Sequence, residues 1–330
     1  MSAQKTIRYG IIGFGEFAEK TIAPAIRRAR NSTVVALQKR SAAAARQKAD
    51  ECSIPLAFDS PEDLAQHPDI DAVYIASANC AHCRETLAAA KAHKHVIVEK
   101  PMALDARQAE CMISACAENG VKLMVAHMIR LSPIIRRVRQ LSLEGRIGEL
   151  KCARAEFVYD ARKSARRWLI DRDVAGGGPV FDIGVHCIDT LRYVLGGEPV
   201  AVAGVLSPAP SEKSTEESAL LALRFPQGVI ASVFSSYTAP FTRVLFEIIG
   251  TEGIITVSDF QCVDRLGRLT IMQGRGEKPS TVNVEEIFVP NLYVDEISMF
   301  TDWILGGAEV EIDGANGLAN QRVIDKAMAL

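Results

Sequence analysis

The chain has 330 residues, enough for two domains that each bury a hydrophobic core. Charged residues (24%) and hydrophobic residues (48%) are in ordinary globular proportions, and a net charge of −2 gives no reason to expect nucleic acid as a partner. No apolar run approaches the ~20 residues of a membrane span. The start, MSAQKTIRYG, enters a strand without a signal-peptide pattern, and the eight scattered cysteines predict reduced thiols in a cytoplasmic protein.

The first 125 residues predict alternating strands and helices, as in a doubly wound parallel sheet. The predicted strands are 7–12, 33–37, 56–58, 72–76, 96–98 and 122–126, with helices at 16–30, from 41, after 60, 80–92 and 105–119. The strands are short and almost continuously apolar, which is typical of parallel strands buried on both faces. We therefore expect a nucleotide-binding domain at 1–125 and a second domain at 126–330.

The rhythm changes after residue 130. A helix at 134–143, a long alternating segment at 150–159 and a helix that ends at 195 precede β-type stretches at 219–225, 229–235, 245–249 and 254–257. Successive strands without helices between them predict a large, mostly antiparallel sheet, followed by helices at 294–305 and 316–330.

A glycine motif joins the first strand to the first helix. The segment GFGEFA reads G-x-G-x-x-A, in which the first glycine permits a tight turn and the second lets the backbone approach a pyrophosphate. The small last residue allows close helix–strand packing, and the helix N-terminus favours phosphate. The predicted dinucleotide contacts are Gly13, Phe14, Gly15, Glu16, Phe17 and Ala18.

The end of the second strand bears on the choice of dinucleotide. NAD sites place an acidic residue about twenty positions past the glycines, but this strand ends in Lys39, Arg40 and Ser41. These residues predict a site for the 2′-phosphate of NADP, while a solvated basic turn is the structural alternative and NAD stays possible.

Two further segments follow strands of the same half. Ser77, Asn79 and His82 follow the fourth strand and are predicted cofactor contacts. Asn79 is predicted to line the nicotinamide pocket or cap the next helix, and a helix-surface or packing role is the alternative for His82. Glu99 and Lys100, which are also predicted cofactor contacts, follow the fifth strand and precede a proline, which keeps the lysine out of helical geometry at the crevice of the sheet. Burial can lower the pKa of a lysine enough for it to exchange a proton near neutral pH.

The pair Asp182 and His186 stands four residues apart behind the loop Gly176-Gly177-Gly178. On a helix this spacing puts both side chains on one face, where they can grip a substrate hydroxyl and move its proton. A surface pair or a metal site is the alternative, but no third ligand is evident and we predict no metal.

Positive charge is concentrated at residues 130–172, where twelve Lys and Arg stand against five Asp and Glu. Arg162-Lys163 and Arg166-Arg167 gather near Trp168. A solvated face is the preferred interpretation, and a mouth that attracts an anionic cofactor or substrate is the alternative.

These motifs, in this order, resemble the Gfo/Idh/MocA family of oxidoreductases. The resemblance covers essentially the whole chain and includes EKPMALD at 99–105, GGGPVFDIGVHCIDTLRYVLGG at 176–197 and YVDEISMFTDWILGG at 293–307. It implies a Rossmann domain, a C-terminal α/β domain with a large open sheet, and a homodimer or dimer of dimers formed through that sheet. One departure is Ser77-Ala78-Asn79 in place of the family's Thr-Pro-Asn.

Carried over by position, the resemblance makes Lys100 the catalytic lysine, followed by a cis proline, with Asp182 and His186 on the reacting carbinol. Arg130 and Trp168 become candidates for the substrate wall, with core packing and a surface ion pair as alternatives. The implied reaction is NAD(P)-dependent hydride transfer on a sugar, cyclic polyol or dihydrodiol. A non-catalytic NAD(P)- and sugar-binding regulator and a glycosidase that retains its nicotinamide are the competing hypotheses, and the sequence does not choose the substrate.

Overall fold

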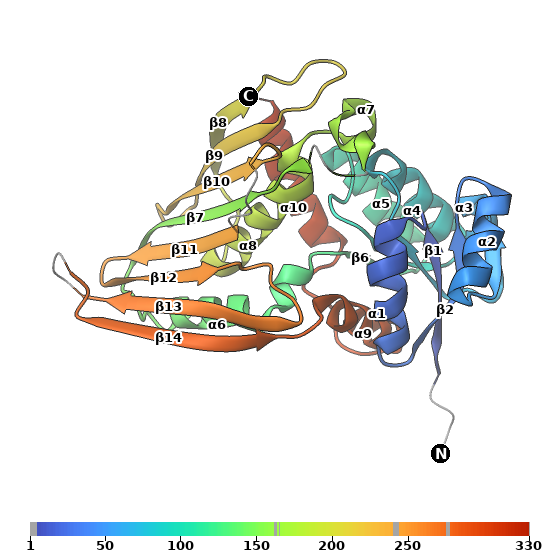
Figure 1. Ribbon diagram of the computed structural model, residues 1–330, viewed down its shortest axis with the longest axis horizontal. Coiled ribbons are helices and arrows are strands. Elements are labelled where there is room, and N and C mark those ends of the chain that lie inside the picture. The colour runs from blue at the N-terminus through green and yellow to red at the C-terminus, as the bar shows by residue number, and fades with distance from the viewer. Residues whose placement is uncertain (1–4, 162–163, 165, 240–243, 275–277, 330) are drawn as a thin grey trace. The chain divides into compact units, whose positions relative to one another are not determined.

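The computed structural model describes residues 5–161, 164, 166–239, 244–274 and 278–329 (Figure 1). The chain divides into two compact units, Met1–Ala126 with Tyr293–Gln321, and His127–Leu292 with Arg322–Leu330. The last part of the chain therefore contributes to both units. The roles predicted for residues 1–125 and 126–330 stay predictions.

The first unit contains a six-stranded parallel sheet, ordered β3-β2-β1-β4-β5-β6. This order is that of the Rossmann fold, and the predicted fold class is confirmed. Its strands are β1 (Ile7–Ile12), β2 (Ser32–Gln38), β3 (Leu56–Phe58), β4 (Ala72–Ile75), β5 (His95–Val98) and β6 (Leu123–Val125).

Helices pack on this sheet, and polar caps fix where several of them begin. Ser41, Ser60 and Asp105 each accept a hydrogen bond from a backbone N–H in the first turn of the helix that follows, as N-caps do. The helices are α1 (Ala23–Arg28), α2 (Ala42–Cys52), α3 (Pro61–Gln66), α4 (His82–Lys91), α5 (Ala106–Glu118), α9 (Leu292–Ile304) and the first half of α10 (Gly314–Met328), whose second half belongs to the second unit.

The first helix differs from the expectation of one helix at 16–30. A π-helical turn, Ala18–Ile22, precedes α1, which ends at Arg28. The apolar side chains at 18, 22, 23, 25 and 26 are buried in the core nonetheless.

Helix α9 belongs to the first unit although it lies almost 300 residues from β1. The hydroxyls of Tyr9 and Thr301 are 2.8 Å apart in the core, and the Lys122 ammonium lies 4.4 Å from the ring centroid of Trp303. These contacts make α9 part of the wall behind the central strands.

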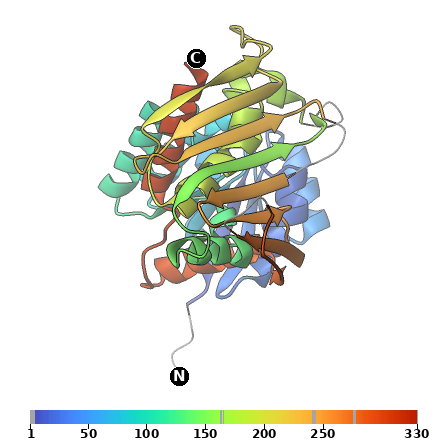
Figure 2. The ribbon, with the colours of Figure 1, turned by 90° about the vertical axis from the view of Figure 1, so that its left-hand side faces the viewer.

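The second unit contains an eight-stranded sheet in the order β14-β13-β12-β11-β7-β10-β9-β8, whose strands face the viewer in Figure 2. Strands β7 and β10 pair in parallel and the other neighbours pair antiparallel, as the prediction of a mostly antiparallel sheet requires. The strands are β7 (Leu150–Val158), β8 (Ala201–Ser207), β9 (Ser218–Arg224), β10 (Ile230–Ser236), β11 (Val244–Gly250), β12 (Gly253–Ser258), β13 (Arg265–Gln273) and β14 (Thr281–Val289).

One face of this sheet is covered by helices. Helix α8 (Val185–Leu195) packs on β7 and β10, and α6 (Pro133–Leu143) packs on β13 and β14. The short α7 (Arg172–Ala175) precedes the glycine loop. Side chains alternate between buried and exposed along β9, β10 and β13, so the opposite face meets solvent in this unit.

Candidate active site

Four segments of the first unit follow strands that end at the same edge of the parallel sheet. Residues 13–18 follow β1, 39–41 follow β2, 76–79 follow β4, and 99–101 follow β5. Strands β1 and β4 are neighbours where the strand order reverses, and open α/β sheets bind their ligands outside the carboxyl ends at that point. The topology therefore brings the predicted cofactor segments together.

The two glycines of the motif meet different surroundings. Gly13 has φ +75°, and a Cβ there would lie 2.5 Å from the backbone nitrogen of Ser77, so only glycine fits. A Cβ on Gly15 would meet only the Gly13 oxygen, at 3.9 Å, which leaves this backbone open to a phosphate. The exposed Glu16 carboxylate pairs with Lys20 at 2.5 Å. The loop thus fits the close approach of a pyrophosphate.

Apolar side chains and one amine fix this loop. Phe14 and Ala18 are buried, whereas the Phe17 ring lies against that of Tyr293 with centroids 5.8 Å apart. The Lys39 ammonium donates a hydrogen bond to the Phe14 carbonyl at 2.8 Å. This predicted 2′-phosphate ligand therefore also supports the loop.

Gln38, which precedes Lys39, was not among the predicted site residues. Its buried side chain accepts a hydrogen bond from the Gly13 N–H and donates one to the Asp59 carbonyl. The Ser41 hydroxyl caps α2 at 3.4 Å from the Ala44 nitrogen. The exposed Arg40 makes no hydrogen bond or ion pair with the residues that the structure describes, so its guanidinium is available to a ligand.

The segment after β4 is held by buried polar side chains. The Ser77 hydroxyl donates to the Glu85 carboxylate at 2.5 Å, and burial raises the pKa of Glu85 to about 7 despite this bond. Asn79 is 4% exposed and His82 is fully buried. The two ring nitrogens of His82 face the carbonyls of Ser77 and Pro101, so this histidine links two strand ends.

Lys100 is partly buried and follows a carboxylate that is itself anchored. Glu99 accepts hydrogen bonds from the Tyr74 hydroxyl at 2.6 Å and from the Lys100 backbone N–H at 3.2 Å. Burial, and then the charge of Glu99, raise the pKa of Tyr74. The Lys100–Pro101 peptide bond is cis, as predicted.

A second buried carboxyl lies near Glu99 and was not predicted. Glu296 of α9 is fully buried, and neither of its carboxyl oxygens has a hydrogen-bond partner in the described part of the chain. Burial, and then the charge of Glu99, raise its pKa well above the ordinary value. Both effects disfavour a negative charge on Glu296.

In the second unit, a buried carboxylate organises the glycine loop. Glu216 accepts hydrogen bonds from the Gly178 and Val180 N–H groups at 3.0 and 3.1 Å. A Cβ on Gly178 would lie 2.0 Å from the Glu216 carbonyl oxygen, which explains the glycine. Glu216 lies 38 residues away in the chain, so the sequence offered no signal for it.

Asp182 and His186 lie on consecutive helical segments, the π-helical turn Val180–Gly184 and α8, and both are buried. Asp182 accepts a hydrogen bond from the Tyr159 hydroxyl at 2.8 Å and lies 3.4 Å from the Arg166 guanidinium. Burial, and then Asp182, raise the pKa of both Tyr159 and Tyr237. Tyr159, Arg166 and Tyr237 were not among the predicted site residues.

The two candidates for the substrate wall occupy different surroundings. Trp168 packs on an apolar cluster that contains Leu169 and Ile183. Tyr159 and Tyr237 belong to the same cluster. Arg130 instead binds Asp189, with its Nε 3.0 Å from both carboxylate oxygens and an Nη 2.8 Å from one. Burial opposes ionisation of Asp189, but His127 and Arg130 outweigh it and lower its pKa. The alternative for Arg130 was a surface ion pair, but this pair is largely buried. The substrate role of Arg130 stays a prediction.

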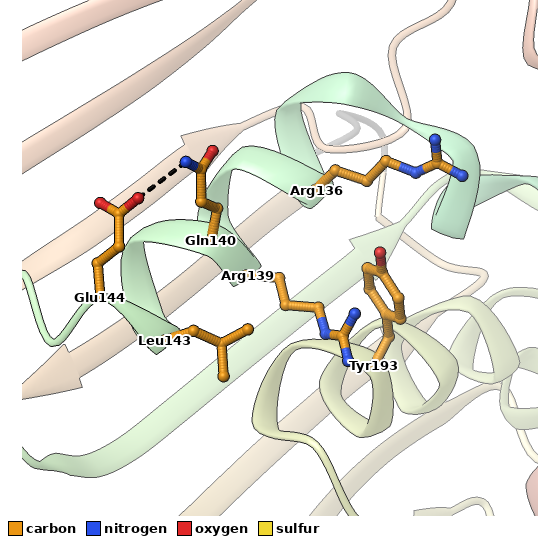
Figure 3. Close-up of a pocket in the computed structure, with 6 residues that line it drawn as sticks. All are labelled: Arg136, Arg139, Gln140, Leu143, Glu144 and Tyr193. Carbon is orange, nitrogen blue, oxygen red and sulfur yellow. Dashed lines mark hydrogen bonds between the residues drawn. The ribbon is translucent and has the colours of Figure 1, made fainter.

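The basic stretch is partly neutralised by carboxylates. Arg137 pairs with Glu285, Arg154 with Glu247, and Arg166 with Asp182. A hollow of about 310 Å³ lies between α6 and α8 and is lined by Arg136, Arg139, Gln140, Leu143, Glu144 and Tyr193. Figure 3 shows these six side chains. None of the predicted site residues lines this hollow, and Arg162 and Lys163 lie outside the described residues.

Two other kinds of feature are absent from the described ranges. No three His, Cys, Asp or Glu side chains are grouped there so as to hold a metal ion. No helix in those ranges has the length and apolar character needed to cross a membrane. All eight cysteines are free thiols.

Comparison with known proteins gives matches in both units. Residues 7–127 match the model of an oxidoreductase family with an NAD-binding Rossmann fold, and residues 135–256 match the Gfo/Idh/MocA C-terminal domain. The 1,5-anhydro-D-fructose reductase of Ensifer adhaerens is 34% identical over 98% of this chain and 96% of that protein. The NADP-dependent D-xylose 1-dehydrogenase of Haloarcula marismortui is 26% identical over 96% and 89%.

A solved structure gives the same fold. The aldose-aldose oxidoreductase of Caulobacter crescentus, complexed with glycerol, superimposes with a TM-score of 0.84 and is 26% identical, over 97% of this chain and 96% of that one. The relatives of this chain are named as dehydrogenases and reductases that act on sugar hydroxyl or carbonyl groups. The chain therefore belongs to the Gfo/Idh/MocA family of NAD(P)-dependent oxidoreductases.

Proposed function

We propose that this enzyme transfers a hydride reversibly between the nicotinamide and a carbinol or carbonyl carbon of a sugar, a cyclic polyol or a dihydrodiol. The observation that carries the proposal is the placement of Lys100. Its backbone is anchored through Glu99 at the same sheet edge as the open Gly15 backbone. The sugar reductase and sugar dehydrogenase among the relatives support this substrate class.

When bound, the nicotinamide supplies the hydride chemistry. Lys100 takes the hydroxyl proton during oxidation and returns it during reduction, a role that its place at the ligand-binding edge of the sheet supports. In the second unit, His186 polarises the reacting carbinol, and Asp182, fixed by Tyr159, accepts a hydrogen bond from a substrate hydroxyl. These three roles extend the predictions from sequence.

NADP is the proposed preferred nucleotide. Arg40 is the exposed cation at the end of β2, where the 2′-phosphate of the adenosine ribose is recognised in Rossmann folds. Its planar guanidinium suits bidentate phosphate contacts. Lys39 and Ser41 contribute from the same turn, and NAD is the weaker alternative.

The substrate is proposed to be uncharged. The guanidinium of Arg166, the cation beside Asp182, is already matched by that carboxylate at 3.4 Å. Trp168 and the tyrosines offer apolar faces with hydroxyl groups, which suit the alternating C–H and O–H surface of a sugar ring. A phosphorylated sugar would compete with Asp182 for the Arg166 guanidinium.

A homodimer or dimer of dimers in the cytoplasm is also proposed. Val205, Leu220 and Phe234 stand opposite one another on neighbouring strands and form an exposed apolar row on the outer face of the eight-stranded sheet. Ile230, on the same strand as Phe234, and Val282, on β14, add exposed apolar surface. An apolar face of this kind favours burial against a second copy.

The direct test measures the absorbance of reduced nicotinamide with NADP or NAD. The panel contains 1,5-anhydro-D-fructose, D-xylose, an inositol and a trans-dihydrodiol. Net oxidation or reduction with one of them supports the proposal. Nucleotide binding without turnover of any carbinol or carbonyl would contradict it, and cofactor retained through purification without net turnover would favour the glycosidase hypothesis instead.

A further inference from the structure

His82 occupies an unusual position at the start of α4. The ring is fully buried, with Nδ1 2.9 Å from the Pro101 carbonyl oxygen and Nε2 3.2 Å from the Ser77 carbonyl oxygen. Both ring nitrogens are therefore occupied by protein backbone. Neither is left for a direct hydrogen bond to a cofactor.

The two carbonyls belong to segments that the proposed reaction uses. Ser77 N lies so close to Gly13 that a Cβ there would be 2.5 Å away, so this segment abuts the phosphate loop. Pro101 follows Lys100 directly. On the other side of Lys100, Glu99 accepts from the Lys100 N–H and from Tyr74. Lys100 is thus tied on one side through Glu99 and on the other through His82.

The two contacts of the His82 ring differ, because only one of its nitrogens carries a hydrogen that can be donated. Burial, opposed by the carbonyl contacts but aided by the Lys100 charge, lowers the pKa of His82 to about 4, so the ring is neutral near pH 7. A neutral imidazole has one N–H, and both neighbours are acceptors. The shorter contact assigns the N–H to Nδ1, which donates to Pro101.

We propose that His82 is a positioning residue for Lys100. Its Nδ1–H holds the Pro101 carbonyl and fixes the backbone of Lys100 relative to the loop at Ser77. The distance between the lysine amine and the nicotinamide position depends on that bond. The inference rests on the proposed function, in which Lys100 moves the substrate proton.

Two amide variants separate the two contacts. His82→Asn keeps a donor near the place of Nδ1, and His82→Gln keeps one near the place of Nε2. We expect His82→Asn to retain kcat within about threefold and His82→Gln to lose about 100-fold, since a displacement near 1 Å costs that much. The nucleotide Kd should change by less than about twofold in both, and the pH profile of kcat should shift only in His82→Gln.

Thr86→Val is the matched control, because Thr86 is buried in the same helix and its hydroxyl has no hydrogen-bond partner in the described chain. It should leave kcat and Tm near the parent values. Equal kcat in both histidine variants, or an equal loss in both with a lowered Tm, would overturn the proposal. A raised nucleotide Kd in both variants would do so as well, in favour of direct cofactor contact.

A second readout does not depend on turnover. Acetic anhydride labels amines, and peptide mass spectrometry gives the rate at Lys100 relative to the exposed Lys20. The rate should match the parent in His82→Asn and differ in His82→Gln. An unchanged rate in both variants would refute the positioning role even in an active enzyme, whereas an inactive parent with the expected labelling pattern would refute only the proposed reaction.

Discussion

Glu85 provides a quantitative test of the buried polar cluster behind the phosphate loop. The carboxyl is 4% exposed, and burial raises its pKa to about 7 from an ordinary value near 4.5, although the Ser77 hydroxyl bond opposes the shift. The folded protein therefore binds this proton more tightly than the unfolded chain does. The stabilisation that comes from protonated Glu85 is complete below pH 4.5 and is lost as the pH rises through 7.

The size of the effect follows from the two pKa values. Above pH 7 the folded protein must hold a buried anion, which costs about 3 kcal/mol relative to the unfolded chain. Glu85→Gln is neutral at every pH and keeps an oxygen acceptor for Ser77. The variant should match the parent near pH 4.5 and exceed its free energy of unfolding by up to about 3 kcal/mol at pH 8.

Urea unfolding of parent and variant at pH 5, 6, 7 and 8 measures the difference directly. The exposed Glu118→Gln, on α5, is the control and should give a difference that does not depend on pH. A flat difference for Glu85→Gln across this range, or a less stable variant at pH 8, would refute the reasoning.

Three other substitutions test separate parts of the account. Arg40→Ala should raise the Kd for NADP about tenfold, through the loss of a charged hydrogen bond, and leave that for NAD nearly unchanged; equal effects in fluorescence titrations would contradict the 2′-phosphate assignment. Arg130→Ala should lower the free energy of unfolding by about 3 kcal/mol, because Asp189 stays buried with a weakened set of partners, and an unchanged urea midpoint would rule this out. Leu220→Lys should shift the light-scattering mass toward the monomer, and an unchanged mass would exclude this face as the interface.

Much of the first unit could be predicted because its local signals agree. The strands at 7–12 and 56–58 have the predicted bounds, since short apolar runs end abruptly at glycine or polar residues. Ser60 caps α3 with a proline at the first helical position, as its sequence indicated. The cofactor loop could be predicted from its local glycine motif, because only glycine tolerates the contact at position 13.

Other features depend on tertiary contacts and could not be predicted from the sequence. Strand β14 is exposed along most of its length and carries polar residues, so it lacks the apolar pattern that marked its neighbours. The return of α9 to the first unit is visible only in pairs such as Tyr9 and Thr301. The partners of Asp182 and of the glycine loop come from distant segments, and the spacing of Asp182 and His186 gives no hint of them.

The central claim is that Lys100 moves the substrate proton, and Lys100→Met tests it most directly. With NADP and the best substrate of the panel, the variant should keep the nucleotide Kd within about twofold and lose at least about 100-fold in kcat, the share expected of general acid–base catalysis. A variant that binds NADP normally and turns over at the parental rate would contradict the account.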